Sequence, residues 1–406
     1  MKCIFLTGLT SSTLGGMEFG NLGNYAVIEP FIEGLKKEFP DHQIYTTIQL
    51  SDKFCSTYQI TSLRNPRFYT YGFATAKETI NDFIRLFTYK YLGWIFASRK
   101  DLILLKSALL KNIHQADFVI DFSGDVFGDN AKYNVFLEGV AKIIISKGLG
   151  KKVFMVASSP GPFNKFWQQL FGLKTLRKVS LIINREDISS QRLLSYGLSS
   201  DKVITTACPS FNFTCDYQIP LDKYCKIKPN LPTVGIIISG WNMPEDSYHK
   251  VPRKKEELTV FLKLIEHIHN TYECNVVLMS HAHKFQPQTG MKQGNDFYIS
   301  KQLFEEAQVE LKSDRLFLFE EILEAKDTKA IISNLDFLVS GRLHGAVSGF
   351  SQYIPTLVVN YGNGPKPLKL KGFVDLIGVP ECLCEPNNLN QLKTTFDELW
   401  NNKEAY

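Results

Sequence analysis

Several features that would point directly to a function are missing from this chain of 406 residues. Its eight cysteines include no CxxC pair, so the sequence favours neither a zinc ribbon nor a thioredoxin-like redox site. No stretch reaches the roughly 18 uninterrupted apolar residues expected of a transmembrane helix. The opening MKCIFLTGL has one lysine and a short apolar run. We therefore expect a first strand there rather than a signal peptide, and a cytoplasmic protein.

Strong charge of either sign is also absent. The chain has 46 basic and 41 acidic residues, and a net charge of +5 is too small to indicate a nucleic-acid partner. It is compatible with an anionic ligand or an anionic membrane surface. Hydrophobic content of 44% and charged content of 21% are ordinary for a globular protein, and the length predicts two or three domains.

Short apolar runs alternate with segments of helical periodicity along most of the chain. Such alternation predicts parallel sheets covered by helices on both faces. The runs occur at residues 2–9, 43–50, 116–124, 151–160 and 179–187, and again at 234–239, 275–281, 315–320, 336–341 and 355–362. Two similar α/β halves of this kind predict a GT-B-like architecture, with two Rossmann-like domains and a cleft between them.

The expected boundaries follow from composition. Residues 1–215 form the first domain, the Pro- and Lys-bearing stretch 216–232 is the best candidate for a linker, and 233–386 form the second domain. A C-terminal helix follows in 387–406. The aromatic and basic insert 75–115 interrupts the α/β pattern: it is either a pair of core-facing helices or an amphipathic patch that touches a membrane, with Trp94 and Tyr89 or Tyr91 at the interface.

Polar residues follow several of the expected strands, where the ligand crevice of a parallel sheet forms. In the first half these motifs are GNLGNYAV (20–27), DFSGDVFGDN (121–130), SSPGPF (158–163) and NRED (184–187). The first is neither GxGxxG nor a P-loop, so it is a weak nucleotide signal or an ordinary tight turn. The carboxylates of the second could bind sugar hydroxyls, act as a base or cap a helix. Arg185 in NRED suits an anion, or pairs with a neighbouring acid.

The motif SGRLHGA (340–346) is the most informative in the second half. We expect Arg342 and His344 at a strand-to-helix turn, where an extended stretch would place both side chains on one face. Histidine titrates close to neutral pH, and the arginine beside it suits an anion. Lys366 lies in a lysine-rich stretch downstream. The HxH of SHAHKF (280–285) has no obvious further ligand nearby, so we interpret it as a polar crevice loop rather than a metal site.

The order of these motifs resembles the polysaccharide pyruvyl transferases over most of the chain. The R-x-H element of SGRLHGA and the following GFSQYIPTLVVNYGNGPK carry the most specific likeness. Asn24 departs from the family pattern, which usually has Asp there, and this puts a role as base at that position in doubt. The insert 75–115 also lies outside the shared pattern.

The resemblance implies transfer of a pyruvyl group from phosphoenolpyruvate to a sugar, with a GT-B-like fold and no metal or redox cofactor. His344 would be the acid, and Asp125 or Asp121 a base. We expect the donor side to use Arg342, Leu343, Arg185 and Lys366. We assign to the acceptor side Asn21, Asn24, Asp121, Ser158 and Ser159. Lipid-linked acceptors are common in such pathways, so peripheral contact with the inner membrane face is a further expectation.

Two other functions remain open from the sequence. A GT-B glycosyltransferase using a nucleotide sugar would need a late ribose-binding glutamate, for which Glu320 or Glu321 could serve. A non-catalytic sugar-binding protein would tolerate loss of His344.

Overall fold

A computed structural model describes residues 2–8, 18, 20–65, 67–70, 72–92, 100–123, 126–129, 131–239, 255–286, 290–360 and 368–403. The chain divides into two compact units. Of the described residues, unit 1 takes those in 2–8 and 31–208, and unit 2 takes those in 18–30, 209–360 and 368–403. Helix α1 (Leu22–Glu38) crosses this division near Pro30.

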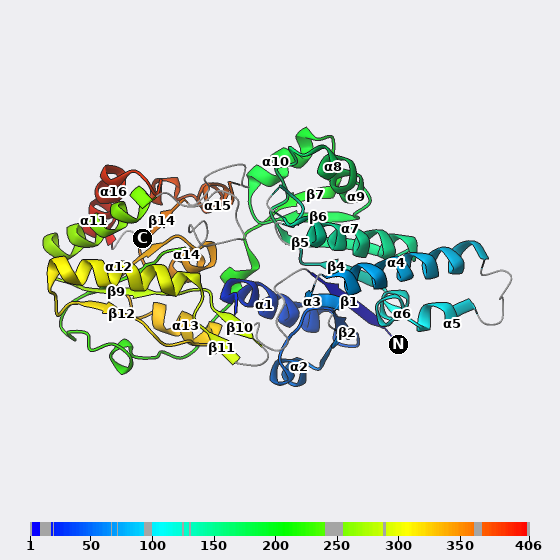
Figure 1. Ribbon diagram of the computed structural model, residues 1–406, viewed down its shortest axis with the longest axis horizontal. Coiled ribbons are helices and arrows are strands. Elements are labelled where there is room, and N and C mark those ends of the chain that lie inside the picture. The colour runs from blue at the N-terminus through cyan, green and yellow to red at the C-terminus, as the bar shows by residue number, and fades with distance from the viewer. Residues whose placement is uncertain are drawn as a thin grey trace. The chain divides into compact units, whose positions relative to one another are not determined.

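Unit 1 is built on a parallel sheet of seven strands in the order β3-β2-β1-β4-β5-β6-β7 (Figure 1). Its strands are rich in Ile, Val and Phe, which suit a sheet buried on both faces. They are β1 Cys3–Thr7, β2 Gln43–Thr46, β3 Ile60–Ser62, β4 Phe118–Asp121, β5 Lys152–Ser158, β6 Leu181–Asn184 and β7 Val203–Thr205.

Helices connect these strands and cover the sheet. Those of unit 1 are α2 Asp52–Tyr58, α3 Arg67–Thr70, α4 Phe73–Phe87 with its π-helical continuation Thr88–Leu92, α5 Lys100–Leu105, α6 Ala108–Gln115, α7 Tyr133–Gly148, α8 Phe166–Gln168, the π-turn Gln169–Leu173, α9 Lys174–Leu176, α10 Asp187–Ser195 and the 3₁₀ turn Ser200–Lys202. Helix α6 begins at a Ser107 cap that accepts from the Leu110 amide, and α10 at a Glu186 cap that accepts from the Ser189 amide.

Unit 2 repeats the arrangement with a parallel sheet of six strands in the order β12-β9-β8-β13-β14-β15. The strands are β8 Thr233–Ile237, β9 Asn275–Met279, β12 Leu316–Leu318, β13 Phe337–Ser340, β14 Thr356–Val359 and β15 Leu383–Cys384, with a separate antiparallel hairpin β10 Lys284–Gln286 and β11 Gly290–Lys292. Its helices are α11 Lys255–Thr271, α12 Asn295–Leu311, α13 Ala325–Ile332, α14 Leu343–Phe350, α15 Lys369–Ile377 and α16 Leu389–Asn401, with 3₁₀ turns Pro209–Asn212, Leu221–Lys223 and Pro380–Cys382.

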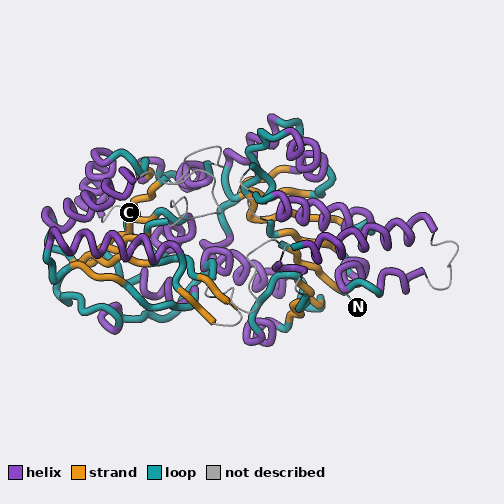
Figure 2. Tube along the Cα trace, viewed as in Figure 1, coloured by secondary structure: helices purple, strands orange, loops and turns teal. Residues whose placement is uncertain are grey.

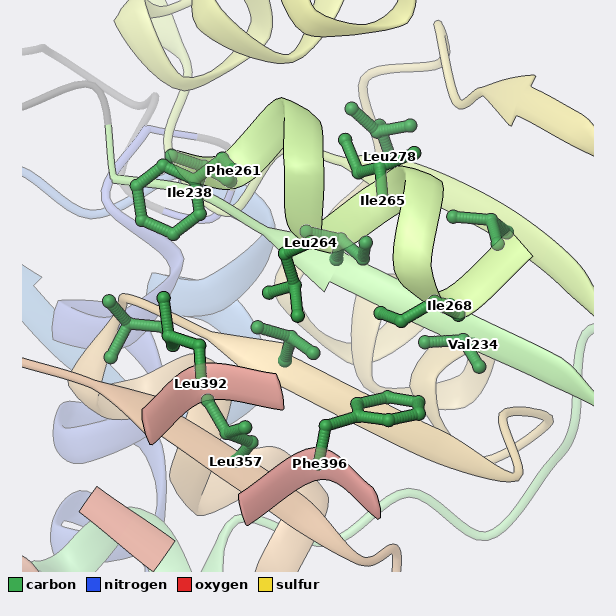
Figure 3. Packing of buried hydrophobic residues seen from close by; sticks show 14 of the residues in the cluster. Val234, Ile238, Phe261, Leu264, Ile265, Ile268, Leu278, Leu357, Leu392 and Phe396 are labelled. Carbon is green, nitrogen blue, oxygen red and sulfur yellow. The ribbon is translucent and has the colours of Figure 1, made fainter. Parts of the chain in front are cut away.

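One core of unit 2 lies between its sheet and the pair α11 and α16. Figure 3 shows Leu264 and Ile268 of α11 beside Leu392 and Phe396 of α16, over the strand residue Val234. Each fully buried side chain of this size contributes roughly 1.5–3 kcal/mol. The C-terminal helix thus packs on unit 2.

The stretch 216–232, which we expected to be a linker, is part of unit 2 instead. Leu221 and Cys225 are buried in an apolar cluster with Ile237 and Leu338, so these residues stabilise the domain rather than separate two domains. The chain passes from one unit to the other at Cys208 and Pro209. The insert 75–115 forms helices α4 to α6, and Leu86, Leu109 and Ile113 join the core of unit 1.

Each sheet has one point where the strand order reverses. In unit 1 the chain moves outward from β1 through β2 to β3 and then returns to begin at β4. In unit 2 it moves from β8 through β9 to β12 and then returns to begin at β13. In open α/β sheets, ligands bind beyond the carboxyl ends of the strands at this switch point. Asp121 ends β4, and Arg342 is the second residue after β13.

Candidate functional site

The switch point of unit 2 begins where β13 ends. Arg342 has an extended backbone (φ −112°, ψ 127°) and caps α14, whose first residue is Leu343. His344 therefore sits in the first turn of a helix. The expectation of one extended stretch with both side chains on one face is wrong, because the helix begins between them. Ser340 closes the turn: its hydroxyl accepts from the Arg342 amide at 3.2 Å and donates to the Arg342 carbonyl at 2.9 Å.

The Arg342 side chain turns toward α12. Its guanidinium forms a paired contact with Asp296, in which Nε donates to Oδ2 at 2.9 Å and Nη2 donates to Oδ1. Asp296 is fully buried in the first turn of α12. This fork geometry fixes the direction of the guanidinium, and its positive charge offsets the buried carboxylate. Sequence reasoning missed Asp296, because GNDFYIS is typical of a helix start.

Two further histidines lie after β9 in the same unit. His281 and His283 are both buried. Burial lowers the pKa of His281 to about 4, with a further contribution from the positive charge of Arg342. Burial also lowers the pKa of His283. Both rings are therefore neutral near pH 7. Among the described residues, no three His, Cys, Asp or Glu side chains gather in a way that could hold a metal ion.

The start of α1 lies against these loops. Asn21 forms an isolated antiparallel bridge with Ala282, and the His283 amide donates to the Gly20 carbonyl at 2.9 Å. A Cβ added at Gly23 would lie 2.0 Å from Nδ1 of His344. Only glycine therefore allows the imidazole this close to the first turn of α1.

The other predicted site residues near the switch point of unit 2 differ in burial and in what they contact. Asn21, directly before α1, and Asn24, in its first turn, are both half-buried. The Leu343 side chain is buried in an apolar cluster with Val347 and Phe373, which leaves its backbone for any donor contact. Lys366 lies outside the described residues. The unit thus brings together Arg342, His344 and the two asparagines, and adds Asp296 and Gly23.

At the switch point of unit 1, Asp121 is fully buried at the end of β4. One carboxylate oxygen accepts from the Ser123 amide at 3.0 Å, and Oδ2 has no hydrogen-bond partner among the described residues. Burial raises the pKa of Asp121 to about 6, and the positive charge of Lys142 partly opposes this rise. A buried carboxyl that titrates near neutral pH is suited to proton transfer. Asp125, expected to be the base, lies outside the described residues.

The Lys142 ammonium belongs to a buried charged group beneath this loop. It lies 3.9 Å from Glu138, one turn earlier on α7. Arg67 and Asp82 form a buried ion pair at 2.5 Å, and Thr79 of α4 donates to Glu138. We missed this group in the sequence, although Glu138 and Lys142, four residues apart within an otherwise apolar stretch, were a signal for it.

The SSPGPF loop and Arg185 meet at the ends of β5 and β6. Arg185 is buried and donates from Nε to the Ser159 hydroxyl at 2.9 Å; with residues that the structure describes it forms no ion pair. We assigned Ser158 to the acceptor side, but its hydroxyl already donates to Asn184 at 2.8 Å. The Asp129 carboxylate accepts from the amides of Asn164 and Lys165, which precede α8, so it holds the loop before that helix rather than capping it.

Comparison with known proteins agrees with this fold. The solved structure of Staphylococcus aureus MnaA with UDP shares 15% identity at a TM-score of 0.58, covering 100% of this chain and 90% of that one. The UDP-GlcNAc 2-epimerase of Methanocaldococcus jannaschii shares 14% identity at a TM-score of 0.57, covering 98% of this chain and 92% of that one. A glycosyltransferase from Rickettsia africae shares 12% identity at a TM-score of 0.54, covering 98% of this chain and 88% of that one. Identities this low show the fold alone, which is GT-B-like as expected.

No curated protein matches the chain in sequence. The family model for polysaccharide pyruvyl transferase, in contrast, matches residues 21–363. The match begins at Asn21, at the start of α1, and includes Asp121, Arg185 and the R-x-H element after β13. A match over most of the chain is decisive, and the chain belongs to the polysaccharide pyruvyl transferase family.

Proposed function

We propose that this protein transfers the pyruvyl group of phosphoenolpyruvate to a sugar of a surface polysaccharide or of its lipid-linked precursor. The product is a cyclic ketal, and inorganic phosphate is released. The observation that carries the proposal is the pair of Arg342 and His344 at the switch point of unit 2, in a chain of this family.

The donor is an anion with a carboxylate and a phosphate, and it binds where cations are fixed in position. Arg342 is held by Asp296, so its direction is set before the donor arrives. The start of α14 adds backbone amides that favour negative charge. In unit 1, Arg185 is a second buried cation at a strand end, without an ion-pair partner among the described residues. We assign the donor contacts to these arginines.

The reaction begins with a proton. His344 donates it to the methylene carbon of phosphoenolpyruvate, which turns that carbon into a methyl group and leaves positive character at C2. A sugar hydroxyl then attacks C2 and loses its proton to a base. A second hydroxyl of the same sugar displaces the phosphate from C2 and closes the ketal, and its proton leaves with the phosphate. This sequence needs neither a metal ion nor a redox cofactor.

Unit 1 supplies the base in this proposal, and each unit supplies acceptor contacts. Asp121 has a pKa of about 6, so it is ionised and able to take a proton at pH 7 and above. Asp125, a few residues later, is the other candidate. Ser159, and Asn21 and Asn24 at the start of α1, offer hydrogen bonds to sugar hydroxyls. The Ser158 hydroxyl already donates its hydrogen bond to Asn184.

Phosphate release from phosphoenolpyruvate in the presence of a panel of glycans and lipid-linked sugars tests the proposal. Wild type is expected to release phosphate only with an acceptor, and His344→Gln to lose this activity by 10²-fold or more, as for removal of a general acid. His269→Gln is the matched control, because His269 lies in the last turn of α11 and bonds to Ser313. Equal rates for the two variants would refute the role of His344.

A glycosyltransferase reaction remains the second candidate, because solved relatives of the same fold are complexes with UDP. It predicts that UDP raises the melting temperature of the protein and that phosphoenolpyruvate does not. The glutamates considered for ribose, Glu320 and Glu321, are exposed in the loop between β12 and α13. Turnover of a nucleotide sugar without any ketal product would favour this alternative.

A further inference from the structure

Helix α4 has an apolar stripe on the side that faces solvent. Phe73 is 87% exposed, and Ile80, Ile84 and Phe87 are 57–59% exposed. These residues recur at intervals of seven, four and three, so they lie along one face of the helix. Tyr91, in the π-helical continuation, is 60% exposed, and its ring packs against Phe87 with centroids 4.9 Å apart.

This stripe is not the face that packs on the domain. Thr75, Asp82 and Leu86 are buried on the opposite side of α4, and Leu86 joins the core of unit 1. Tyr89 is half-buried against His114. One face of α4 therefore already packs on the core of unit 1, and the exposed stripe is a second apolar face. Monomeric proteins rarely expose contiguous apolar surface of this kind without a partner.

Helix α5 extends the surface. It packs beside α4 and its π-helical continuation, and Figure 2 shows the two helices running together beyond the sheet of unit 1. Leu102 and Leu105 of α5 are each about half exposed. We call the exposed apolar side chains of these helices the α4–α5 face. Its residues are Phe73, Ile80, Ile84, Phe87, Tyr91, Leu102 and Leu105.

The charges around this face are unbalanced. Of its acidic neighbours, Glu78 and Asp82 pair with Arg67 and Asp82 also pairs with Arg85, and Asp101 lies 3.8 Å from His114. Four lysines are exposed on or beside these helices, and none of them forms an ion pair with a residue that the structure describes: Lys77, Lys90, Lys106 and Lys111. The face is therefore apolar with a basic border.

We propose that the α4–α5 face binds an anionic lipid surface. Aromatic and aliphatic side chains enter the region between headgroups and acyl chains, and the lysines contact the lipid phosphates. The same charge argues against a second copy of this chain, because two basic faces would repel each other on contact. No described helix is long and apolar enough to cross a membrane, so the contact is one of adsorption. The proposal stands independently of the reaction proposed above.

Co-sedimentation of the full chain with lipid vesicles tests the proposal. We expect binding to vesicles of phosphatidylcholine with phosphatidylglycerol, and weak binding to phosphatidylcholine alone. The variant Ile80→Ser, Ile84→Ser, Phe87→Ser removes the centre of the stripe and should lose most of the binding. Val309→Ser is the matched control, because Val309 is 75% exposed on α12 of unit 2.

A second variant removes basic residues at the border of the face and keeps its apolar side chains, so it tests the lipid contact separately. Replacing Lys77, Lys90 and Lys106 by Ser should weaken binding to anionic vesicles roughly a hundred-fold, since each lysine near such a surface contributes about a factor of five. Equal recovery of wild type and both variants would overturn the proposal. So would a concentration-dependent dimer in sedimentation velocity that the Ser variants abolish, because the face would then bind a second copy of the chain.

Discussion

Asp121 offers a prediction in which stability and activity change in opposite directions. Burial raises its pKa from the ordinary value of 3.8 to about 6. The folded state therefore binds this proton more tightly than the unfolded state, and the carboxyl favours folding most at low pH. As the pH rises from about 4 to about 6, this contribution is lost. At about 1.4 kcal/mol per pKa unit, the ionised carboxylate costs about 3 kcal/mol at pH 7.

The variant Asp121→Asn removes the titration and keeps an acceptor for the Ser123 amide. We expect it to exceed wild type in free energy of unfolding by up to about 3 kcal/mol at pH 7, and by little at pH 4. Urea unfolding at pH 4, 5, 6, 7 and 8 measures the difference, in which all other titrating groups cancel. Asp216→Asn, at an exposed position, is the control and should show no pH-dependent gain.

The same variant should be slower in phosphate release, by 10²-fold or more if Asp121 is the base. A residue that lowers stability and raises activity is typical of a functional site. A variant that is less stable than wild type at pH 7 would refute the argument from burial. A more stable variant with full activity would confirm that burying the ionised carboxylate lowers stability, but would show that Asp121 is not the base.

Three further changes probe the placement of the donor site. Gly23→Ala puts a methyl group in the space of the His344 ring, so we expect at least ten-fold lower activity, with a changed histidine signal in NMR spectra as the check. Asp296→Ala leaves the partly buried Arg342 without its carboxylate, and urea unfolding should show a loss of up to roughly 3 kcal/mol; an unchanged value would contradict the ion pair. Arg185→Gln removes a buried cation, so the KM for phosphoenolpyruvate should rise with little change in unfolding free energy, whereas a changed KM for the acceptor alone would place Arg185 elsewhere.

Much of the fold could be predicted from local pattern. Strands such as β4 and β13 are short apolar runs ended by polar residues, which is what burial on both faces of a parallel sheet requires. The same pattern placed Asp121 and Arg342 at strand ends. The helix start at Leu343 was harder to predict, because Arg342 is an uncommon cap and no Ser, Thr, Asp or Asn marks the position.

Long-range partners could not be predicted in this way. Asp296 lies 46 residues before Arg342, and nothing in either segment specifies the other. The approach of Gly23 to His344 likewise depends on tertiary packing across more than three hundred residues. For the insert 75–115, the sequence left core-facing helices and an amphipathic patch as alternatives, and only the packed structure shows that the face of α4 with Leu86 is buried.

The central claim is that phosphoenolpyruvate is protonated at its methylene carbon and its pyruvyl group is transferred to a sugar. The most direct test is the reaction in D₂O with unlabelled phosphoenolpyruvate and a panel of acceptors, followed by NMR of the glycan. The account predicts a ketal methyl group that carries one deuteron, absent with His344→Gln. A glycan that gains no ketal, while a nucleotide sugar is consumed to extend it, would contradict the claim.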